Sequence, residues 1–299
     1  MRNPEVCENT APSPPMAMED MTETAKPLNK HADITGVLLQ KAYSGGQWID
    51  ATSGERISVY NPSNGKIIGS VPSLDTTEMQ NAIATANEAL PDWRHMLPRR
   101  RADLLMRWHD LIVERRDSLA ALMTLEQGKP LSDSQGEIEY GASFVRWFAE
   151  ETNRVYGEII PSHLPDRKMF VQREPLGVVG MITPWNFPSA MLARKAAAAL
   201  AAGCTMVAKP ATQTPYSAFA MAELAERAGV PKGVFSVLTG KSGEIGAEMT
   251  ANPTVRKITF TGSTEVGKKL IAQAASTVKK VSMELGGNAP LIIFEDANI

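Results

Sequence analysis

The sequence predicts an α/β fold in which a doubly wound, Rossmann-type, mainly parallel sheet follows a region of helices and hairpins. From Leu176 onward, short apolar segments alternate with helical patterns at a spacing typical of βαβ units. Before Leu176, a hairpin-type turn at Asn64-Gly65 is followed by long stretches with apolar residues at helical spacing. The order of these two patterns along the chain indicates the fold.

Composition argues against several classes of protein. The 299 residues are 43% apolar and 21% charged, and the net charge of -2 gives no electrostatic reason to expect nucleic acid or an anionic membrane as a partner. The longest apolar run, Ala190 to Ala202, is interrupted by Arg194 and Lys195 and predicts no membrane span. Two cysteines, Cys7 and Cys204, are too few for a disulfide framework or a metal cluster, which favours a reducing, cytoplasmic location.

The chain divides into three predicted parts. Residues 1–35 are rich in proline and acidic residues and are expected to be a disordered lead-in. Residues 36–287 are expected to form a cofactor-binding domain, and residues 288–299 to begin a catalytic domain that is truncated. Extended segments separated by prolines predict a protruding arm near 156–174, which would need a partner sheet because an isolated hairpin is only marginally stable.

Turn and cap signals place the elements of the first half. Short strands are expected between Tyr43 and Val71. Asp75 and Glu78 have the spacing of a capping box, which predicts that a helix begins there. The expected helices run through Met79 to Trp93, from Pro98 onward, up to Gly128, and from about Ser132 to Phe148.

The second half alternates strands with helices. The expected strands are 177–183, 205–208, 234–238, 257–260, 280–283 and 289–294, and the expected helices are 189–202, 215–228, 243–250 and 263–275. Ligands of such sheets bind at the carboxyl ends of the strands. Four segments with polar or small residues fall at those ends: Thr183 to Asn186, Lys209 to Thr212, Thr261 to Gly267, and Glu284.

Two of these segments have features of a nucleotide site. Thr261 to Gly267 joins a strand to a helix with small residues, which suits an anion at the helix N-terminus, although a tight strand-helix turn explains the pattern equally well. Lys209 ends a strand and precedes Pro210, so it can bond a ribose or a 2′-phosphate. The alternative for Lys209 is an ordinary surface lysine.

The other two segments have features of a catalytic site. Asn186 lies in a loop stiffened by two prolines, where a fixed side-chain amide can donate to an oxyanion, or can simply cap a turn. Glu284 follows an apolar segment and precedes Gly286 and Gly287, and a carboxylate held there can act as a general base.

Together the segments resemble the aldehyde dehydrogenase superfamily, from about Leu39 to the last residue. The matching motifs are Ile182 to Pro188, Lys209 to Pro215, Phe260 to Gly267 and Glu284 to Gly287. Within the superfamily the chain looks most like the succinate-semialdehyde dehydrogenases, on the basis of Met123 to Pro130, Ala201 to Thr205 and Val281 to Pro290.

The resemblance implies a reaction and a set of roles. A cysteine would attack the aldehyde, hydride would pass to a nicotinamide, and water would release the acid. Glu284 would activate that water, Asn186 would help hold the oxyanion, and Arg194 would bind the substrate carboxylate unless it is a helix-surface arginine. The cofactor-binding residues that the resemblance implies are Trp185, Asn186, Lys209, Pro210, Ala211, Thr212, Gly262, Ser263, Gly267 and Leu285.

Thr212 bears on the choice of cofactor. Many NAD-preferring relatives have a glutamate at the matching position, which binds the ribose hydroxyls and repels a 2′-phosphate. Threonine removes that repulsion, so we expect NADP to bind at least as well as NAD.

The nucleophile that the resemblance requires lies further along the family's sequence than Ile299. Cys204 matches a structural position, and Cys7 falls in the lead-in, so neither replaces it. We therefore expect a fragment that lacks activity on its own, whose partner is a small-molecule aldehyde and whose full-length relatives form homo-oligomers. The alternative is a nucleotide-binding pseudoenzyme or assembly partner without catalysis.

Overall fold

A computed structural model describes residues 33–298, so nearly all of the expected lead-in at 1–35 lies outside the described residues. Its main sheet has seven strands in the order β11-β10-β7-β8-β9-β1-β2. Five are parallel, namely β7 (Val178–Ile182), β8 (Thr205–Lys209), β9 (Phe235–Val237), β10 (Val255–Gly262) and β11 (Lys280–Leu285). The doubly wound fold predicted from the sequence is therefore confirmed.

The strand order reverses beside β7. The chain passes from β7 to β8 and β9 on one side, and then returns to place β10 and β11 on the other side. Parallel sheets of this kind bind ligands outside the carboxyl ends of their strands, at such a reversal. At the far edge, β1 (Ala42–Ser44) pairs antiparallel with β9, and β2 (Gln47–Ile49) pairs with β1.

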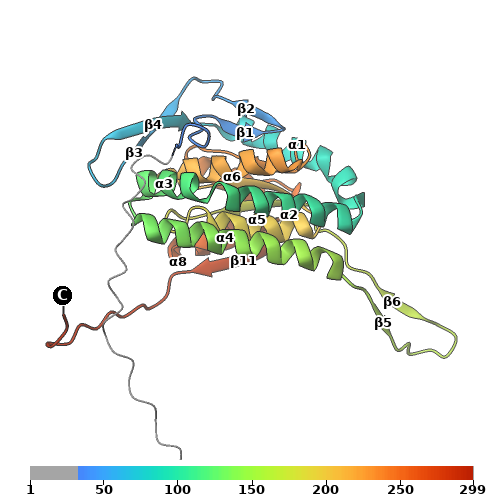
Figure 1. Ribbon diagram of the computed structural model, residues 1–299. Coiled ribbons are helices and arrows are strands. Elements are labelled where there is room, and N and C mark those ends of the chain that lie inside the picture. Colours follow the sequence, from blue (N-terminus) through green and yellow to red (C-terminus); the bar gives the residue numbers. More distant parts are fainter. Residues whose placement is uncertain (1–32, 299) are drawn as a thin grey trace, which may run out of the picture. The chain divides into compact units, whose positions relative to one another are not determined.

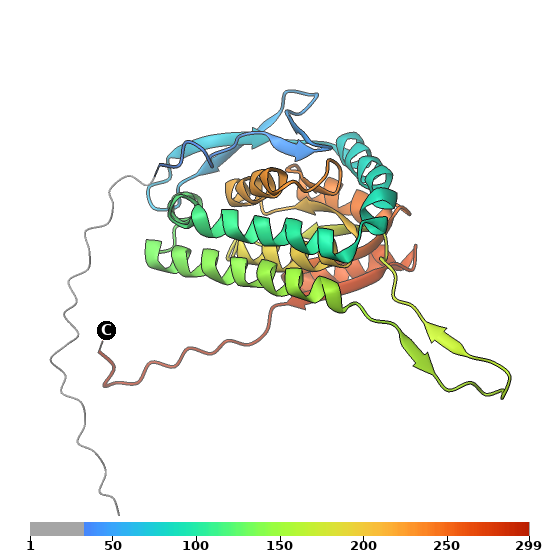
Figure 2. The same cartoon turned by 45° about the vertical axis from the view of Figure 1, so that its right-hand side comes forward.

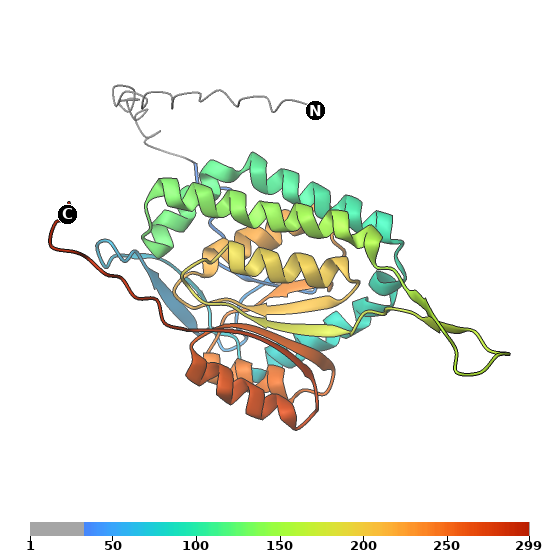
Figure 3. The same cartoon turned by 90° about the horizontal axis from the view of Figure 1, so that it is seen from below.

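Helices cover both faces of the sheet (Figures 1 and 3). On one face lie α2 (Pro98–Glu114), α3 (Arg116–Gln127), α4 (Leu131–Glu151), α5 (Ala190–Ala201) and α6 (Pro215–Ala228). On the other lie α1 (Thr76–His95), α7 (Ser242–Ala251) and α8 (Thr264–Ala275). A 3-10 turn, η1 (Thr152–Arg154), follows α4. Among the described residues, no helix is long and apolar enough to cross a membrane.

Local signals explain where these helices begin and how closely they pack. The predicted capping box forms at α1, where the Asp75 side chain accepts from the Glu78 N–H and the Glu78 side chain accepts from the Asp75 N–H. Helix α4 approaches α5 at Gly141, where a Cβ atom would lie 3.3 Å from the Cα of Ala190. Glycine and alanine at this contact allow the two helices to pack closely.

Two hairpins lie outside the main sheet. β3 (Arg56–Tyr60) and β4 (Ile67–Pro72) pair antiparallel around the Asn64-Gly65 turn. β5 (Glu158–Ile160) and β6 (Met169–Val171) form a separate two-stranded sheet that projects away from the helices (Figure 2). In this arm Ile159 is 75% exposed and Phe170 is 70% exposed.

The strand expected at 289–294 is wrong, because these residues adopt no regular structure. Leu291, Ile292, Ile293 and Phe294 are all exposed. A β-strand forms by pairing with a neighbour, and no described residue pairs with this segment. An apolar, β-branched run is therefore insufficient to predict a strand where the partner is lacking.

Two buried carboxylates hold the N-termini of the helices that follow β7 and β8. Glu126 on α3 accepts from the backbone N–H groups of Tyr216 and Ser217 at 2.8 Å each, at the start of α6. Glu137 on α4 does the same at the start of α5. Each carboxylate accepts from N–H groups that have no partner within their own helix. Its negative charge also interacts favourably with the positive end of the helix dipole.

Glu126 should make stability depend on pH. Burial raises its pKa from an ordinary 4.5 to about 7. Because the folded chain then holds this proton more tightly than the unfolded chain, the contribution of Glu126 to stability falls as pH rises from 4.5 to 7. Relative to Glu126→Gln, the wild-type chain should lose up to about 3 kcal/mol of unfolding free energy between pH 4.5 and pH 8.

Urea denaturation of both proteins across this pH range measures the difference. Glu88→Gln, at an exposed position of α1, is the matched control and should show no such trend. A stability difference between wild type and Glu126→Gln that stays constant with pH would show that the carboxyl keeps its ordinary pKa.

Candidate functional site

Strand register brings the candidate segments to one edge of the sheet. Ile182, at the end of β7, lies opposite Lys209 on β8 and opposite Phe260 on β10. Thr261 on β10 lies opposite Glu284 on β11. The segments that the sequence places at four strand ends are therefore neighbours in space.

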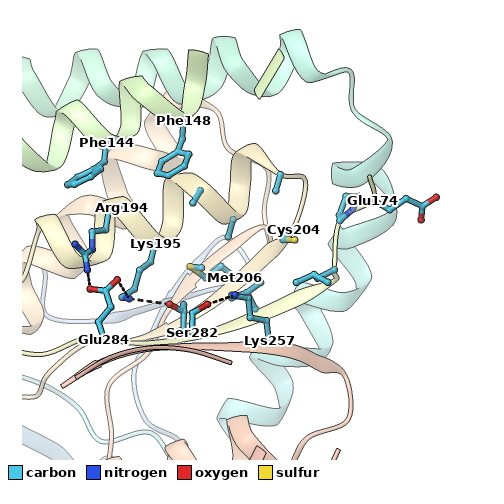
Figure 4. Close-up of a pocket in the computed structure, with 17 residues that line it drawn as sticks. Phe144, Phe148, Glu174, Arg194, Lys195, Cys204, Met206, Lys257, Ser282 and Glu284 are labelled. Atoms are coloured by element: carbon cyan, nitrogen blue, oxygen red, sulfur yellow. Dashed lines mark hydrogen bonds and ion pairs between the residues drawn. The ribbon is translucent and has the colours of Figure 1, made fainter. Parts of the chain in front are cut away.

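Glu284 lies in a cleft of about 540 Å³ between α4, α5 and the sheet (Figure 4). Its side chain is 49% exposed and forms ion pairs with Arg194 and with Lys195, whose Nζ lies 3.5 Å from Oε1. The hydroxyl of Thr261 lies 3.4 Å from the other carboxylate oxygen. Arg194 thus points into the cleft instead of out from the helix surface, and it contacts the residue predicted to be the base.

Lys195 is a site residue that the sequence alone did not reveal. Its Nζ donates to the Thr259 hydroxyl at 3.2 Å, and burial, followed by the charges of Arg194 and Lys257, lowers its pKa to about 8. In the sequence Lys195 served only to interrupt an apolar run. The sequence did contain a signal, because Lys195 lies among the alanines of an apolar helix and such a helix is expected to be buried.

Strand alternation explains the rest of the cleft wall. Lys257 and Thr259 lie two positions apart on β10, as do Ser282 and Glu284 on β11. The two side chains of each pair therefore face the same side of the sheet. Lys257 Nζ donates to the Ser282 hydroxyl at 2.6 Å. The residues that line this cleft include three cations and two carboxylates. The cations are Arg194, Lys195 and Lys257, and the carboxylates are Glu174 and Glu284.

Lys209 is buried, with 4% of its surface exposed, so the surface-lysine alternative is wrong. Its Nζ donates to the hydroxyl of Ser242 at 2.6 Å. Burial lowers its pKa to about 8. A buried ammonium group has three donors, so Lys209 can bond further oxygen atoms of a ligand in addition to Ser242.

The loop after β7 holds Asn186 by both its main chain and its side chain. The side-chain oxygen accepts from the Phe187 N–H at 3.1 Å, and the backbone carbonyl accepts from Lys129 Nζ at 2.9 Å. The first contact agrees with the turn-capping alternative. An oxyanion would instead be bound by the other end of the amide, its NH₂ group. Neighbouring Trp185 is 54% exposed.

The turn from β10 into α8 combines a cap with close packing. Ser263 is the N-cap of α8, and its hydroxyl accepts from the Val266 N–H at 3.3 Å. Gly262 precedes it at the end of β10. A Cβ atom on Gly267 would lie 2.4 Å from a methyl carbon of Leu285. Gly267 therefore allows α8 to lie against β11, and the first turn of α8 can receive an anion.

The segment after β8 contributes to a second cleft. Pro210 is buried, while Ala211 and Thr212 are partly buried. Thr212 and Trp185 line a cleft of about 470 Å³ that also borders the β3–β4 hairpin. The structure thus divides the predicted site residues, with Arg194 and Glu284 in one cleft and Trp185 and Thr212 in another.

Comparisons with known proteins agree on one family. The sequence profile described as "Aldehyde dehydrogenase family" matches residues 48–299. A glutarate-semialdehyde dehydrogenase of Pseudomonas aeruginosa is 60% identical over 260 residues, which are 87% of this chain and 54% of that protein. The NADP(+) succinate-semialdehyde dehydrogenase of Escherichia coli is 57% identical over 260 residues, again 87% of this chain and 54% of that protein.

A solved structure supports the same conclusion. The crystal structure of an Escherichia coli NADP dependent enzyme matches with a TM-score of 0.85 and 56% identity, covering 88% of this chain and 55% of that one. The chain therefore spans about half the length of the curated relatives that it matches.

Lys209 should lower the stability of the folded chain at neutral pH. Its pKa falls from an ordinary 10.5 to about 8, so the charged form is favoured less in the folded chain than in the unfolded one. Replacing it by methionine removes this cost but also the bond to Ser242. We expect Lys209→Met to raise the free energy of unfolding at pH 7 by about 2 kcal/mol.

The gain should shrink as pH rises from 8 toward 10.5, because the lysine then loses its charge in the folded chain while the unfolded chain still holds the proton, which raises the stability of the wild type. Chemical denaturation at pH 7 and pH 10 tests this. Lys268→Met, at an exposed position of α8, serves as the control. A Lys209→Met protein that is less stable than wild type at pH 7 would contradict the argument.

Proposed function

The chain belongs to the aldehyde dehydrogenase family, and we propose that it is the cofactor-binding part of an NADP-linked enzyme that oxidises succinate semialdehyde to succinate. The proposal rests chiefly on one observation, the contact between Arg194 and Glu284 in the cleft beneath α4. It places a cation suited to a substrate carboxylate beside a carboxylate suited to activating water. We further propose that the protein works in a reducing compartment such as the cytoplasm.

Arg194 and Glu284 can act in sequence. A guanidinium group binds carboxylates through paired N–H groups, so the carboxylate of the semialdehyde competes with Glu284 for Arg194. Binding of the substrate would then release Glu284, which accepts a proton from the water that frees the acid product. The excess of positive charge around Glu284 keeps the site suited to anionic aldehydes.

The residues at the strand ends fit a dinucleotide. Lys209 offers buried donors, and Ser263 marks the start of α8, where an anion is favoured. Thr212 provides a neutral side chain three residues after Lys209. When bound, the nicotinamide supplies the hydride acceptor of the oxidation. The chain's own contribution would be to hold the cofactor by these groups, while the NH₂ group of Asn186 would donate to the substrate oxygen.

The β5–β6 arm supports an oligomeric enzyme. Ile159 and Phe170 expose apolar side chains on a hairpin that is too short to be stable alone. We propose that the arm pairs with a second copy of the whole protein. A nucleotide-binding protein without catalysis is the alternative function, and the two differ in whether the whole enzyme turns over the aldehyde, since both predict that this chain alone binds NADP without turnover.

Cofactor preference is tested at Thr212. We expect Thr212→Glu to weaken NADP binding at least about tenfold, because a carboxylate would repel the 2′-phosphate, and to change NAD binding much less. Fluorescence titration with NADPH and NADH measures both affinities. Thr212→Gln, of similar size but neutral, is the matched control. Wild-type protein that binds NAD alone would overturn the assignment.

Catalysis needs a thiol that the described residues do not supply. Cys204 is buried in the floor of the first cleft, and buried cysteines are ordinarily inert. We therefore expect the purified 299-residue chain to bind NADP without oxidising succinate semialdehyde. Absorbance at the NADPH band measures turnover, and Cys204→Ser is the control. Oxidation that persists after mutation of Asn186 would refute the mechanism.

A further inference from the structure

We propose that Lys129 and Glu137 form a clamp that positions the loop at residues 183–189, which carries Trp185 and Asn186. The clamp is an ion pair between Lys129, two residues before the start of α4, and Glu137, in the second turn of α4. Its importance for catalysis rests on the proposed function, since Asn186 is there the donor to the oxyanion. Its effect on the order of the loop does not depend on that assignment.

Glu137 holds the end of the loop. Its side chain is almost fully buried on α4, and one carboxylate oxygen accepts from the N–H groups of Ser189 at 2.9 Å and Ala190 at 3.1 Å. These groups begin α5 and have no partner within that helix. The direction of the loop into α5 is therefore set by a side chain of α4.

Lys129 holds the middle of the same loop. Its ammonium group pairs with the second carboxylate oxygen of Glu137 and donates to the Asn186 carbonyl at 2.9 Å. It also lies 4.2 Å from the centre of the Phe187 ring, within the range of a cation–π interaction. One cation thus contacts both the backbone carbonyl of Asn186 and the side chain of the next residue.

A comparison within the chain separates this arrangement from ordinary helix capping. Glu126 caps α6 through two backbone bonds, and no ion pair to a lysine or arginine is found for it among residues 33–298. Capping alone therefore needs only a carboxylate. The lysine is added at the loop that contains Asn186, where it contacts the loop itself.

The loop needs external support because of its own sequence. Pro184 and Pro188 lack N–H groups, so fewer hydrogen bonds are available within the loop. The pair is balanced in charge, with Glu137 buried and 12% of the Lys129 side chain exposed, so removing the lysine leaves a buried carboxylate without its counter-charge. The clamp accordingly acts as a unit, and loss of either residue should loosen the whole segment.

Amide hydrogen exchange of residues 183–191 tests the clamp in the full chain without cofactor. Lys129→Met should speed exchange of this segment about tenfold or more, and Lys129→Arg should restore most of the protection. Arg116→Met is the matched control, because it removes an exposed ion pair to another residue of α4, Glu139, and should leave the segment unchanged. Should Lys129→Met not fold, Phe187→Leu, which removes only the ring beneath the lysine, should give a smaller increase.

Unchanged exchange in a folded Lys129→Met or Phe187→Leu protein overturns the proposal, as does an equal increase in Arg116→Met. NADPH titration of the same proteins separates the two claims. Weaker binding by Lys129→Met with recovery in Lys129→Arg supports a positioning role. Equal affinity despite faster exchange refutes that role. If the wild-type chain does not bind NADPH, the proposed function fails while the exchange result still decides the clamp.

Discussion

Parallel pairing of β7 with both β8 and β10 is the constraint on which the rest of the structure depends. This pairing reverses the strand order, so the carboxyl ends of strands that are far apart in the sequence meet at one edge. The helices α5 and α6 begin there as well, and their N-terminal N–H groups have no partner within their own helix. The same geometry that gathers these strand ends thus also creates unpaired donors, which Glu126 and Glu137 satisfy.

Much of the fold could be predicted because its causes are local. The capping residue Asp75, the turn at Asn64-Gly65 and the alternation after Leu176 act over a few residues each, and the structure has the corresponding elements. The segment 289–294 was mispredicted because strand formation depends on a partner that no local pattern specifies. Local propensity describes what a segment permits, whereas pairing decides what it adopts.

The site was less predictable, since it consists of contacts between distant segments. The sequence identified Arg194 and Glu284 separately, but not that they touch, because that contact requires α5 to lie against β11. Lys195, Lys129 and Glu137 went unnoticed for a related reason. A charged residue in a sequence is most often solvated, and only the packing of helices around it shows that it is buried and paired.

Two buried charged side chains, Lys195 and Lys209, distinguish this part of the structure from the apolar core around it. Lys195 and Lys209 keep charges where burial disfavours them, and both have pKa values lowered to about 8. In a chain selected for stability alone, methionine would fill either position with less cost. The two lysines have different polar partners, since Lys195 lies beside Glu284 and Lys209 lies beside Ser242 at the start of α7. Glu284 and Thr259 offset part of the desolvation cost of Lys195, and Ser242 offsets part of the cost of Lys209. These polar contacts allow each ammonium group to keep its charge at neutral pH, although burial lowers its pKa.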